Sequence, residues 1–563
     1  MRFFKVLYFL GCPLFFSLFD HVQLSARAED CPKNNFRPDP DRSADNLVLE
    51  ESVDCGDLPY RPSSRQDFCD NFDGKLLGLA EKIVGLAGVF YDEQQELTLA
   101  LTSEAYQTAL SESAVVERYK TALLDTFGPT VFLSQLDEAE AETMLLSIER
   151  TVKPIPPPPL PQRERSLQDS CPVAYEQISA DEMECLLYER MKILLPTFAL
   201  NLDSAQFSFQ DLHANFERIR NEVFKKFGED VLVADLDEKR NKIVFYVTSK
   251  KVGKKVKRLT RKTLNVPKQQ VQTIVRGPRA SSIILDNGEP TLDERLRPVR
   301  GGTKIQVSQA VANDDCTIGF VAKREDDNSV GFVTASHCSN ELYALDGAEA
   351  YQNQEGLDED LIGKETSDGS SRENPNLPCD PFYNECVWSD SSFYTFENEI
   401  QCDTAIFKTN EENSNELRPN GKRQTWYSLR IDGDPLMGEK LWKVGKTTGR
   451  TRGLLKLTCI YYGQEDGIGL SCQDIIDAWD GIEPIDPPLF GRSGDSGSAV
   501  FTTLGANSRF AWIKGIYWGR DYYAEGCQDP EFYSCYDFYM SPISNVQCDH
   551  GKLRTHYNDV PEC

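Results

Sequence analysis

Three short stretches of the sequence carry residue types suited to nucleophilic chemistry. Gly494-Asp495-Ser496-Gly497 sets a serine between glycines, which reach backbone angles closed to other residues. Such a turn can project a hydroxyl with free backbone N–H groups beside it. His337 ends an apolar, strand-like run, and histidine is the usual general base near neutral pH. Asp403 opens another apolar run. Taken singly, these stretches also fit a glycine turn, a histidine beside a disulfide and a capping aspartate.

Taken together and in this order, the three stretches resemble the motifs of the chymotrypsin-like serine proteases (the trypsin superfamily). The matching runs are Thr334-Ala335-Ser336-His337-Cys338, Asp403-Thr404-Ala405 and Gly494-Asp495-Ser496-Gly497. The bacterial branch, with α-lytic protease and the streptogrisins, is the most similar, and the resemblance covers roughly residues 300–548. It implies a fold with an all-β catalytic domain of two antiparallel β-barrels.

The resemblance also implies a role for each residue. Ser496 would be the nucleophile, His337 the general base and Asp403 the group that orients the imidazole. Backbone N–H groups of Gly494 and Ser496 would form the oxyanion hole. Lys443 stands where the bacterial branch has an arginine, so we expect it to form an ion pair with Asp495.

Substrate contacts are expected around the same loop. Phe490 and Gly491 lie near the predicted floor of the primary pocket, and the Trp518-Gly519 strand edge should pair with the substrate backbone. Two residues depart from the family pattern. Ser498 replaces a glycine, and Tyr517 replaces a serine that bonds the triad aspartate.

Cysteine usage indicates disulfides and no metal. Of 17 cysteines, Cys12 lies in the predicted leader, which leaves an even, dispersed set without a Cys-x-x-Cys pair. No His/Cys cluster has metal-ligand spacing, so no metal or cofactor is expected. The resemblance implies a Cys316–Cys338 bond, and proximity in the sequence suggests Cys459–Cys472.

Composition and the N-terminal segment predict a secreted protein. Residues 1–28 have a positive start, an apolar run and an Ala-x-Ala site, as in a signal peptide. The formal net charge of −28 argues against nucleic acid as a general partner. No later run is long enough to cross a membrane. We expect a monomer that acts on proteins or peptides.

The segment before the protease-like region is predicted to contain two α+β modules. An internal repeat of helix, hairpin, helix and strand divides it into residues 29–152, a proline-rich linker at 153–170 and residues 171–280. In the first copy the final strand is predicted at Thr130–Leu133. A junction at 281–300 precedes the catalytic domain at 301–563. The modules are similar to the pro-regions of the bacterial branch, which act as folding chaperones and would be a partner of the protease.

The basic run at 250–262 has two interpretations. It is either a solvated helix face or a pro-region helix that faces the acidic protease domain. Nucleic-acid binding is disfavoured because no aromatic residues interrupt the charges.

Two rival functions use the same residues. The first is a protease-fold binding protein with little activity, favoured by Tyr517 and Ser498 alone. The second is an esterase, but the Gly-x-Ser-x-Gly elbow and the Ser, Asp, His order are missing. We therefore predict a serine endopeptidase made as a precursor.

Overall fold

The structure is a computed structural model, and all the residues that it describes belong to one compact unit. The predicted signal peptide, the proline-rich linker and residues 29–71 lie outside the described residues. The described ranges are 72–148 (without 93, 134, 137–139, 142 and 146–147), 180–275 (without 228–229), 291–555 and 560. Within 291–555 the gaps are 309–314, 353–359, 370–384, 398–399, 410–413, 418–424, 432, 464–467, 479–489, 504–509 and 523–535.

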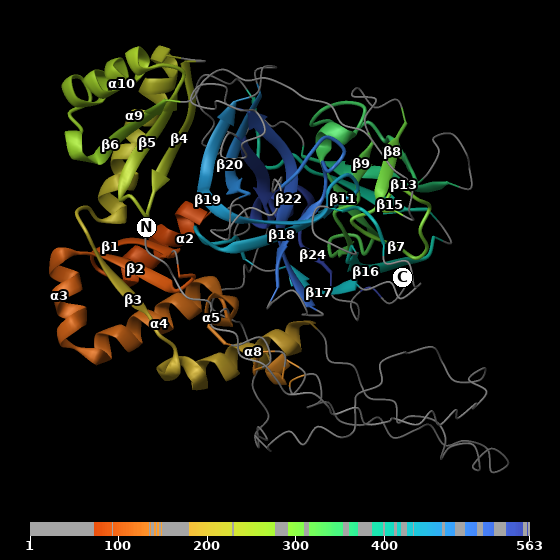
Figure 1. Ribbon diagram of the computed structural model, residues 1–563, viewed down its shortest axis with the longest axis horizontal. Helices are drawn as coiled ribbons and strands as arrows, with labels where there is room; N and C mark the ends of the chain where they lie inside the picture. Colours follow the sequence, from red (N-terminus) through yellow and green to blue (C-terminus); the bar gives the residue numbers. More distant parts are fainter. Residues whose placement is uncertain are drawn as a thin grey trace, which may run out of the picture. The chain divides into compact units, whose positions relative to one another are not determined.

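A three-stranded sheet forms the first α+β module (Figure 1). Its hairpin, β1 (Leu86–Tyr91) and β2 (Leu97–Thr102), has almost wholly buried apolar strands. The helices of this module are α2 (Phe72–Lys82), α3 (Ser103–Ser111), α4 (Ser113–Phe127), α5 (Thr130–Leu133), α8 (Ala180–Leu194) and η1 (Leu195–Thr197).

The last strand of this module is not where the sequence placed it. Residues Thr130–Leu133 form the short helix α5, whose Val131 and Phe132 are buried. The strand beside β2 is β3 (Asn201–Ala205), which pairs with it in parallel. The predicted division at residue 152 is therefore wrong, because residues beyond the linker complete the first sheet.

A second module repeats this arrangement. Its strands are β4 (Val231–Asp237), β5 (Lys242–Val247) and β6 (Val271–Val275), and β5 pairs with β6 in parallel. Its helices are α9 (Phe209–Phe227), α10 (Lys250–Lys262) and η3 (Lys268–Gln270). In both modules a hairpin is followed by helical elements and then by a parallel third strand. In the first module that strand is β3 and not the segment that the internal repeat predicted.

The rest of the chain is mostly β-sheet. An eight-stranded sheet has the order β24, β10, β11, β15, β13, β12, β8, β9. Its strands are β8 (Lys304–Val307), β9 (Cys316–Thr317), β10 (Phe320–Arg324), β11 (Val330–Thr334), β12 (Glu349–Tyr351), β13 (Leu361–Asp368), β15 (Ser392–Phe396) and β24 (Leu553–Arg554).

Six further strands close into an antiparallel ring. The pairings run β18, β19, β20, β23, β22, β21 and back to β18. Their bounds are β18 (Lys440–Gly445), β19 (Gly449–Gly463), β20 (Ile468–Asp477), β21 (Ala499–Thr502), β22 (Phe510–Tyr522) and β23 (Tyr536–Pro542). The remaining elements are β7 (Val299–Gly301), η4 (Ser336–Cys338), β14 (Glu385–Val387), β16 (Cys402–Phe407), β17 (Thr425–Ile431) and α11 (Ile543–His550). No helix among the described residues is long and apolar enough to cross a bilayer.

The second module is joined to this ring by strand pairing. β4 lies beside β19 (Figure 1), where Ala234 is opposite Tyr461. Through this pairing, the sheet of the second module is continuous with the six-stranded ring.

Candidate active site

His337 lies at the end of β11, beside a carboxylate from the neighbouring strand. β11 pairs antiparallel with β15, with Thr334 opposite Ser392. This register brings the residues just after β11 next to those just before β15. His337 Nδ1 lies 2.9 Å from Asp390 Oδ2, and its backbone N–H donates to Asp390 Oδ1 at 3.1 Å. The Asp390 side chain is 1% exposed and that of His337 32% exposed.

The prediction that Asp403 orients His337 is wrong. The carboxylate of Asp403 accepts hydrogen bonds from the Arg300 guanidinium, at 2.9 Å from Nε and 2.6 Å from Nη2. The physical reason is strand pairing, since β16 pairs with β7 and β17 and not with β11. Asp390 is not among the residues that the sequence motifs single out. The signal that could have found it is the strand-like run Ser392–Phe396 that follows.

The Asp390 turn is held by hydrogen bonds from the six-stranded ring. The Asp390 backbone N–H donates to Ser541 Oγ at 2.9 Å, and that hydroxyl donates to Gln473 Oε1 at 2.7 Å. Gln473 Nε2 donates to the Trp388 carbonyl at 2.7 Å. Trp518 Nε1 also donates to Gln473 Oε1, at 3.0 Å. Position and orientation of the carboxylate are thus fixed by β20, β22 and β23.

A second histidine supports the same turn. His550 Nε2 lies 2.9 Å from Ser391 Oγ, and its Nδ1 lies 2.9 Å from Ser367 Oγ. Ser391 Oγ in turn lies 2.6 Å from Ser389 Oγ, which donates to Asp549 Oδ2 at 2.6 Å. The residues on both sides of Asp390 are therefore tied to α11.

The loop that carries Ser496 has the left-handed turns that its glycines predict. Gly494 and Gly497 both have φ of +87°. A Cβ on Gly497 would lie 2.1 Å from Thr334 Oγ1 and 2.9 Å from Ala335 N, so glycine allows the loop to sit against the end of β11. The Ser496 carbonyl accepts from Thr317 N at 2.8 Å.

The hydrogen bonding of the backbone around Ser496 bears on the predicted oxyanion hole. Within the described residues, no hydrogen bond uses the backbone N–H of Gly494 or Ser496. The Gly494 carbonyl is turned away and accepts from Thr317 Oγ1 at 2.7 Å. The Ser496 hydroxyl donates to the Trp518 carbonyl at 3.5 Å, so donation to His337 requires it to leave that carbonyl.

Asp495 forms the buried ion pair that the sequence suggested. Lys443 Nζ lies 3.0 Å from Asp495 Oδ2, and both side chains have no exposed surface. Burial alone would raise the pKa of Asp495, but Lys443 and hydrogen bonds from Thr448 and the Arg492 backbone hold it below its ordinary value. Burial lowers the pKa of Lys443 although Asp495 acts in the opposite direction. The pair anchors the residue immediately before Ser496.

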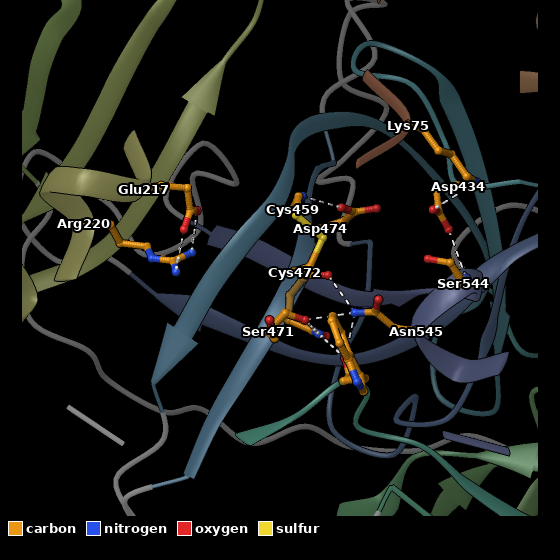
Figure 2. The surroundings of a disulfide bond; sticks show 12 residues. Lys75, Glu217, Arg220, Asp434, Cys459, Ser471, Cys472, Asp474, Ser544 and Asn545 are labelled. Atoms are coloured by element: carbon orange, nitrogen blue, oxygen red, sulfur yellow. Dashed lines mark hydrogen bonds and ion pairs between the residues drawn. A yellow bond between two sulfur atoms is a disulfide. The ribbon is translucent and has the colours of Figure 1, made fainter. Parts of the chain in front are cut away.

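Two disulfides of the structure have the pairing that the sequence suggested. Cys316 is bonded to Cys338, next to His337, and Cys459 is bonded to Cys472 across β19 and β20 (Figure 2). The sulfurs of Cys316 and Cys338 and a ring nitrogen of His337 are the group of metal-binding size found among the described residues. Because both sulfurs are in a disulfide, neither is a thiolate ligand.

The predicted pocket residues differ in what they face. Phe490 is fully buried and packs against Tyr517, with ring centroids 6.0 Å apart. A Cβ on Gly491 would lie 2.4 Å from Tyr517 Cζ and 2.6 Å from its hydroxyl, so the phenol covers this glycine. A Cβ on Gly519 would meet nothing within 4 Å, whereas Trp518 is 7% exposed and stacks on a neighbouring ring. Open space therefore lies beside Gly519 rather than beside Phe490.

The two departures from the family pattern have structural roles. Among the described residues, Tyr517 forms no hydrogen bond with Asp390 or Asp403, because its ring turns toward Phe490 and Gly491. Ser498 Oγ donates to the Asp495 carbonyl and so closes the turn around Ser496. A Cβ on Gly445 would lie 2.6 Å from this hydroxyl, which shows how closely β18 approaches the turn.

The two modules contact β19 and the segment that precedes β18, beside the Cys459–Cys472 disulfide. The Arg220 guanidinium of α9 lies 3.8 Å from the ring centroid of Tyr461 on β19. Lys75 Nζ lies 3.5 Å from Asp434 Oδ2, and the Tyr91 N–H donates to the Met437 carbonyl at 2.7 Å. Figure 2 shows Arg220 with Glu217, and Lys75 with Asp434, around this disulfide.

Several carboxyl groups are buried at these contacts. Both side-chain oxygens of Asp235 and of Glu238, and Oδ2 of Asp474, have no hydrogen-bond partner among the described residues. Burial, together with neighbouring carboxylates, raises the pKa of Asp235, Glu238 and Asp474 well above ordinary values. Burial and the charge of Glu217 raise the pKa of Asp73 to about 7, although Arg220 acts to lower it.

Comparison with known proteins gives structural matches alone. No family model matches the chain. No curated protein matches it either. Among solved structures, the chain is similar to a glutamic-acid-specific serine protease at 18% identity and a TM-score of 0.29, with 46% of this chain and 99% of that chain covered. It is also similar to Thermobifida fusca protease A (18% identity, TM-score 0.28, 45% and 96% covered) and to a Nocardiopsis protease (15%, 0.28, 45% and 97%).

Proposed function

We propose that the chain is a secreted serine endopeptidase that is made as a precursor with a pro-region. The observation that carries the proposal is the hydrogen-bonded pair of His337 and Asp390, at 2.9 Å, beside a glycine-rich turn that presents Ser496. The free N–H groups of Gly494 and Ser496 support it, because acyl transfer needs such donors. The buried Lys443–Asp495 pair supports it as well. The lysine neutralises Asp495 and fixes this turn, so no α-amino group released by cleavage of the chain is needed to do so.

In the proposed mechanism, Ser496 Oγ attacks the peptide carbonyl while His337 takes its proton. The imidazolium then donates that proton to the leaving amine, which gives an acyl-enzyme and a free amine. Water then attacks the acyl-enzyme while His337 takes a proton from it. The imidazolium returns that proton to Ser496 Oγ, and the carboxylic acid is released. Asp390 holds the imidazole with Nδ1 protonated and stabilises its cation. Each oxyanion donor contributes roughly 3 kcal/mol.

The proposal extends to the arrangement of the chain. The ring of six strands and the eight-stranded sheet would be the two barrels of the catalytic domain, with the site between them. The two α+β modules would be the pro-region, bound to β19 through β4. Cleavage near residue 300 would separate them from the protease.

Fluorophosphonate labelling of the secreted protein, read by intact mass, tests the activity. We expect one probe on the wild-type protein, on a fragment that begins near residue 300, and none on Ser496→Ala. If neither the secreted protein nor a trypsin-treated sample is labelled, the proposal fails. Hydrolysis of peptide substrates by the labelled form, against a simple ester, separates a peptidase from an esterase.

A further inference from the structure

Helix α10 carries a dense and unbalanced positive charge. Of its 13 residues, Lys250–Lys262, none is acidic. The eight cations are Lys250, Lys251, Lys254, Lys255, Lys257, Arg258, Arg261 and Lys262. They stand in a chain whose formal net charge is −28, so the helix is locally opposite in sign to the whole protein.

The apolar side of α10 is already used within its own module. Val252, Val256 and Leu259 are buried, and the helix lies against β5, β6 and α9. A Cβ on Gly253 would lie 2.9 Å from Thr273 Oγ1, so this face packs closely on the sheet. All eight cations are exposed. The contacts of the apolar side of α10 are therefore with its own module, and the cations lie on the opposite, exposed side.

Among the described residues, none of the eight cations has an acidic partner. No ion pair or hydrogen bond of their side chains exists within the part of the chain that the structure describes. Like charges also recur at a spacing of four residues, as in Lys250–Lys254, Lys251–Lys255 and Arg258–Lys262. Such pairs destabilise a helix, as do Lys250 and Lys251 at its positive end. Mixed charges would solvate this face without that repulsion, so solubility alone does not explain a set of one sign.

We propose that α10 is a docking surface for a linear anionic polysaccharide. A helix of 13 residues is about 20 Å long, and its exposed side offers cations along that whole length. A polymer with regularly spaced carboxylate or sulfate groups is complementary to such a row. The inference goes beyond the proposed peptidase activity and does not depend on it.

The side chains of α10 favour a polysaccharide over other anionic partners. The helix has no aromatic residue, so it offers no stacking platform for the bases of a single-stranded nucleic acid. Its apolar residues Val252, Val256 and Leu259 are buried, so none is free to enter the acyl region of a membrane. The remaining interaction is electrostatic and is screened by salt.

The test uses full-length Ser496→Ala protein, which keeps the module attached, and heparin as the probe. A triple variant replaces Lys254, Lys255 and Arg258 by Gln, which retains helix propensity. A control replaces the exposed Lys82, Lys225 and Lys226 by Gln and changes net charge equally. We expect at least a tenfold loss of heparin affinity in the α10 variant, with less than a twofold change in the control.

Salt dependence and competing probes complete the test. The plot of log affinity against log salt should be shallower for the α10 variant, and its far-UV circular dichroism should match that of the parent. No heparin binding at 0.15 M salt, or equal loss in the control, would overturn the proposal. Tighter binding to duplex DNA or to phosphatidylserine vesicles than to heparin would overturn it too, because the ligand of α10 would then be a nucleic acid or a membrane.

Discussion

His337 and Asp390 lie at the facing ends of two antiparallel neighbours, β11 and β15, with Nδ1 and Oδ2 2.9 Å apart. Asp403, which the motif suggested, is held instead by Arg300 at 2.6 Å. A carboxylate that accepts from Nδ1 fixes the tautomer in which Nε2 is free to accept a proton, and its charge also stabilises the imidazolium.

Replacing the two aspartates separately distinguishes their roles. We expect Asp390→Asn to lower kcat for a peptide substrate by about 10⁴-fold, because the amide favours the wrong imidazole tautomer. Asp403→Asn should change kcat by less than about tenfold, since it removes an ion pair away from the imidazole. Steady-state kinetics on both purified variants, with unfolding midpoints as controls, gives the answer. A larger loss in Asp403→Asn would refute the assignment.

The Lys443–Asp495 pair should be costly to break from one side. Lys443→Met leaves the fully buried Asp495 carboxylate without its cation, so we expect a loss of about 3–5 kcal/mol of unfolding free energy. Adding Asp495→Asn should restore part of it, because the uncompensated charge is then gone. Urea unfolding in the Ser496→Ala background measures both, with the exposed Lys364→Met as control. Equal stability of Lys443→Met and its parent would contradict this account.

Stability should fall as pH rises, because the carboxyl groups at the module contacts are buried. Their folded-state pKa values are raised, so the folded state binds more protons than the unfolded chain between pH 4 and the raised values. For Asp73 this window runs from its ordinary pKa of 3.8 to about 7. The stabilisation is complete below the window and lost as pH passes through it. Thermal unfolding of full-length Ser496→Ala at pH 5 and pH 8 should give the higher midpoint at pH 5.

One isosteric substitution tests the cause of that pH dependence. Asp235→Asn removes a buried titrating group and leaves its charged neighbours in place, the cation Arg240 and the carboxyl groups Asp237, Asp73 and Asp474. We expect the variant to gain stability at pH 8 and to change little at pH 5. Exposed Asp203→Asn serves as the control. A pH-independent midpoint in the parent, or a loss at pH 8 in Asp235→Asn, would show that these groups do not titrate as argued.

The sequence predicted the parts of the site that are local in the chain. The turn around Ser496 follows from its glycines, and the Lys443–Asp495 pair follows from the position of Lys443, where the bacterial branch has an arginine. The acid partner of His337 was mispredicted, because Asp390 and Asp403 both open strand-like runs. Which of those strands lies beside β11 is a long-range pairing that local pattern does not encode.

The same limit explains the error in the first module. The apolar and β-branched residues of Thr130–Leu133 favour a strand, but the segment forms one helical turn whose Val131 and Phe132 are buried. The strand Asn201–Ala205 carries few apolar residues, and only its parallel pairing with β2 reveals it. Tertiary pairing thus overrode local propensity at both places.

The phenol of Tyr517 should limit the size of the side chain accepted next to the nucleophile loop. The phenol covers Gly491, at the predicted floor of the primary pocket. A smaller residue at position 517 would leave the volume of the phenol empty. We expect Tyr517→Ser to raise kcat/KM for peptides with Phe or Leu before the cleaved bond, relative to Ala, by about tenfold, since one or two methylenes in a pocket are worth about 1–3 kcal/mol. Gly491→Ala should clash with the phenol and lose activity, and Tyr517→Ser should partly restore it. The four combinations, assayed on Ala and Phe substrates, form a cycle, and strictly additive effects would show that the two residues do not share the pocket.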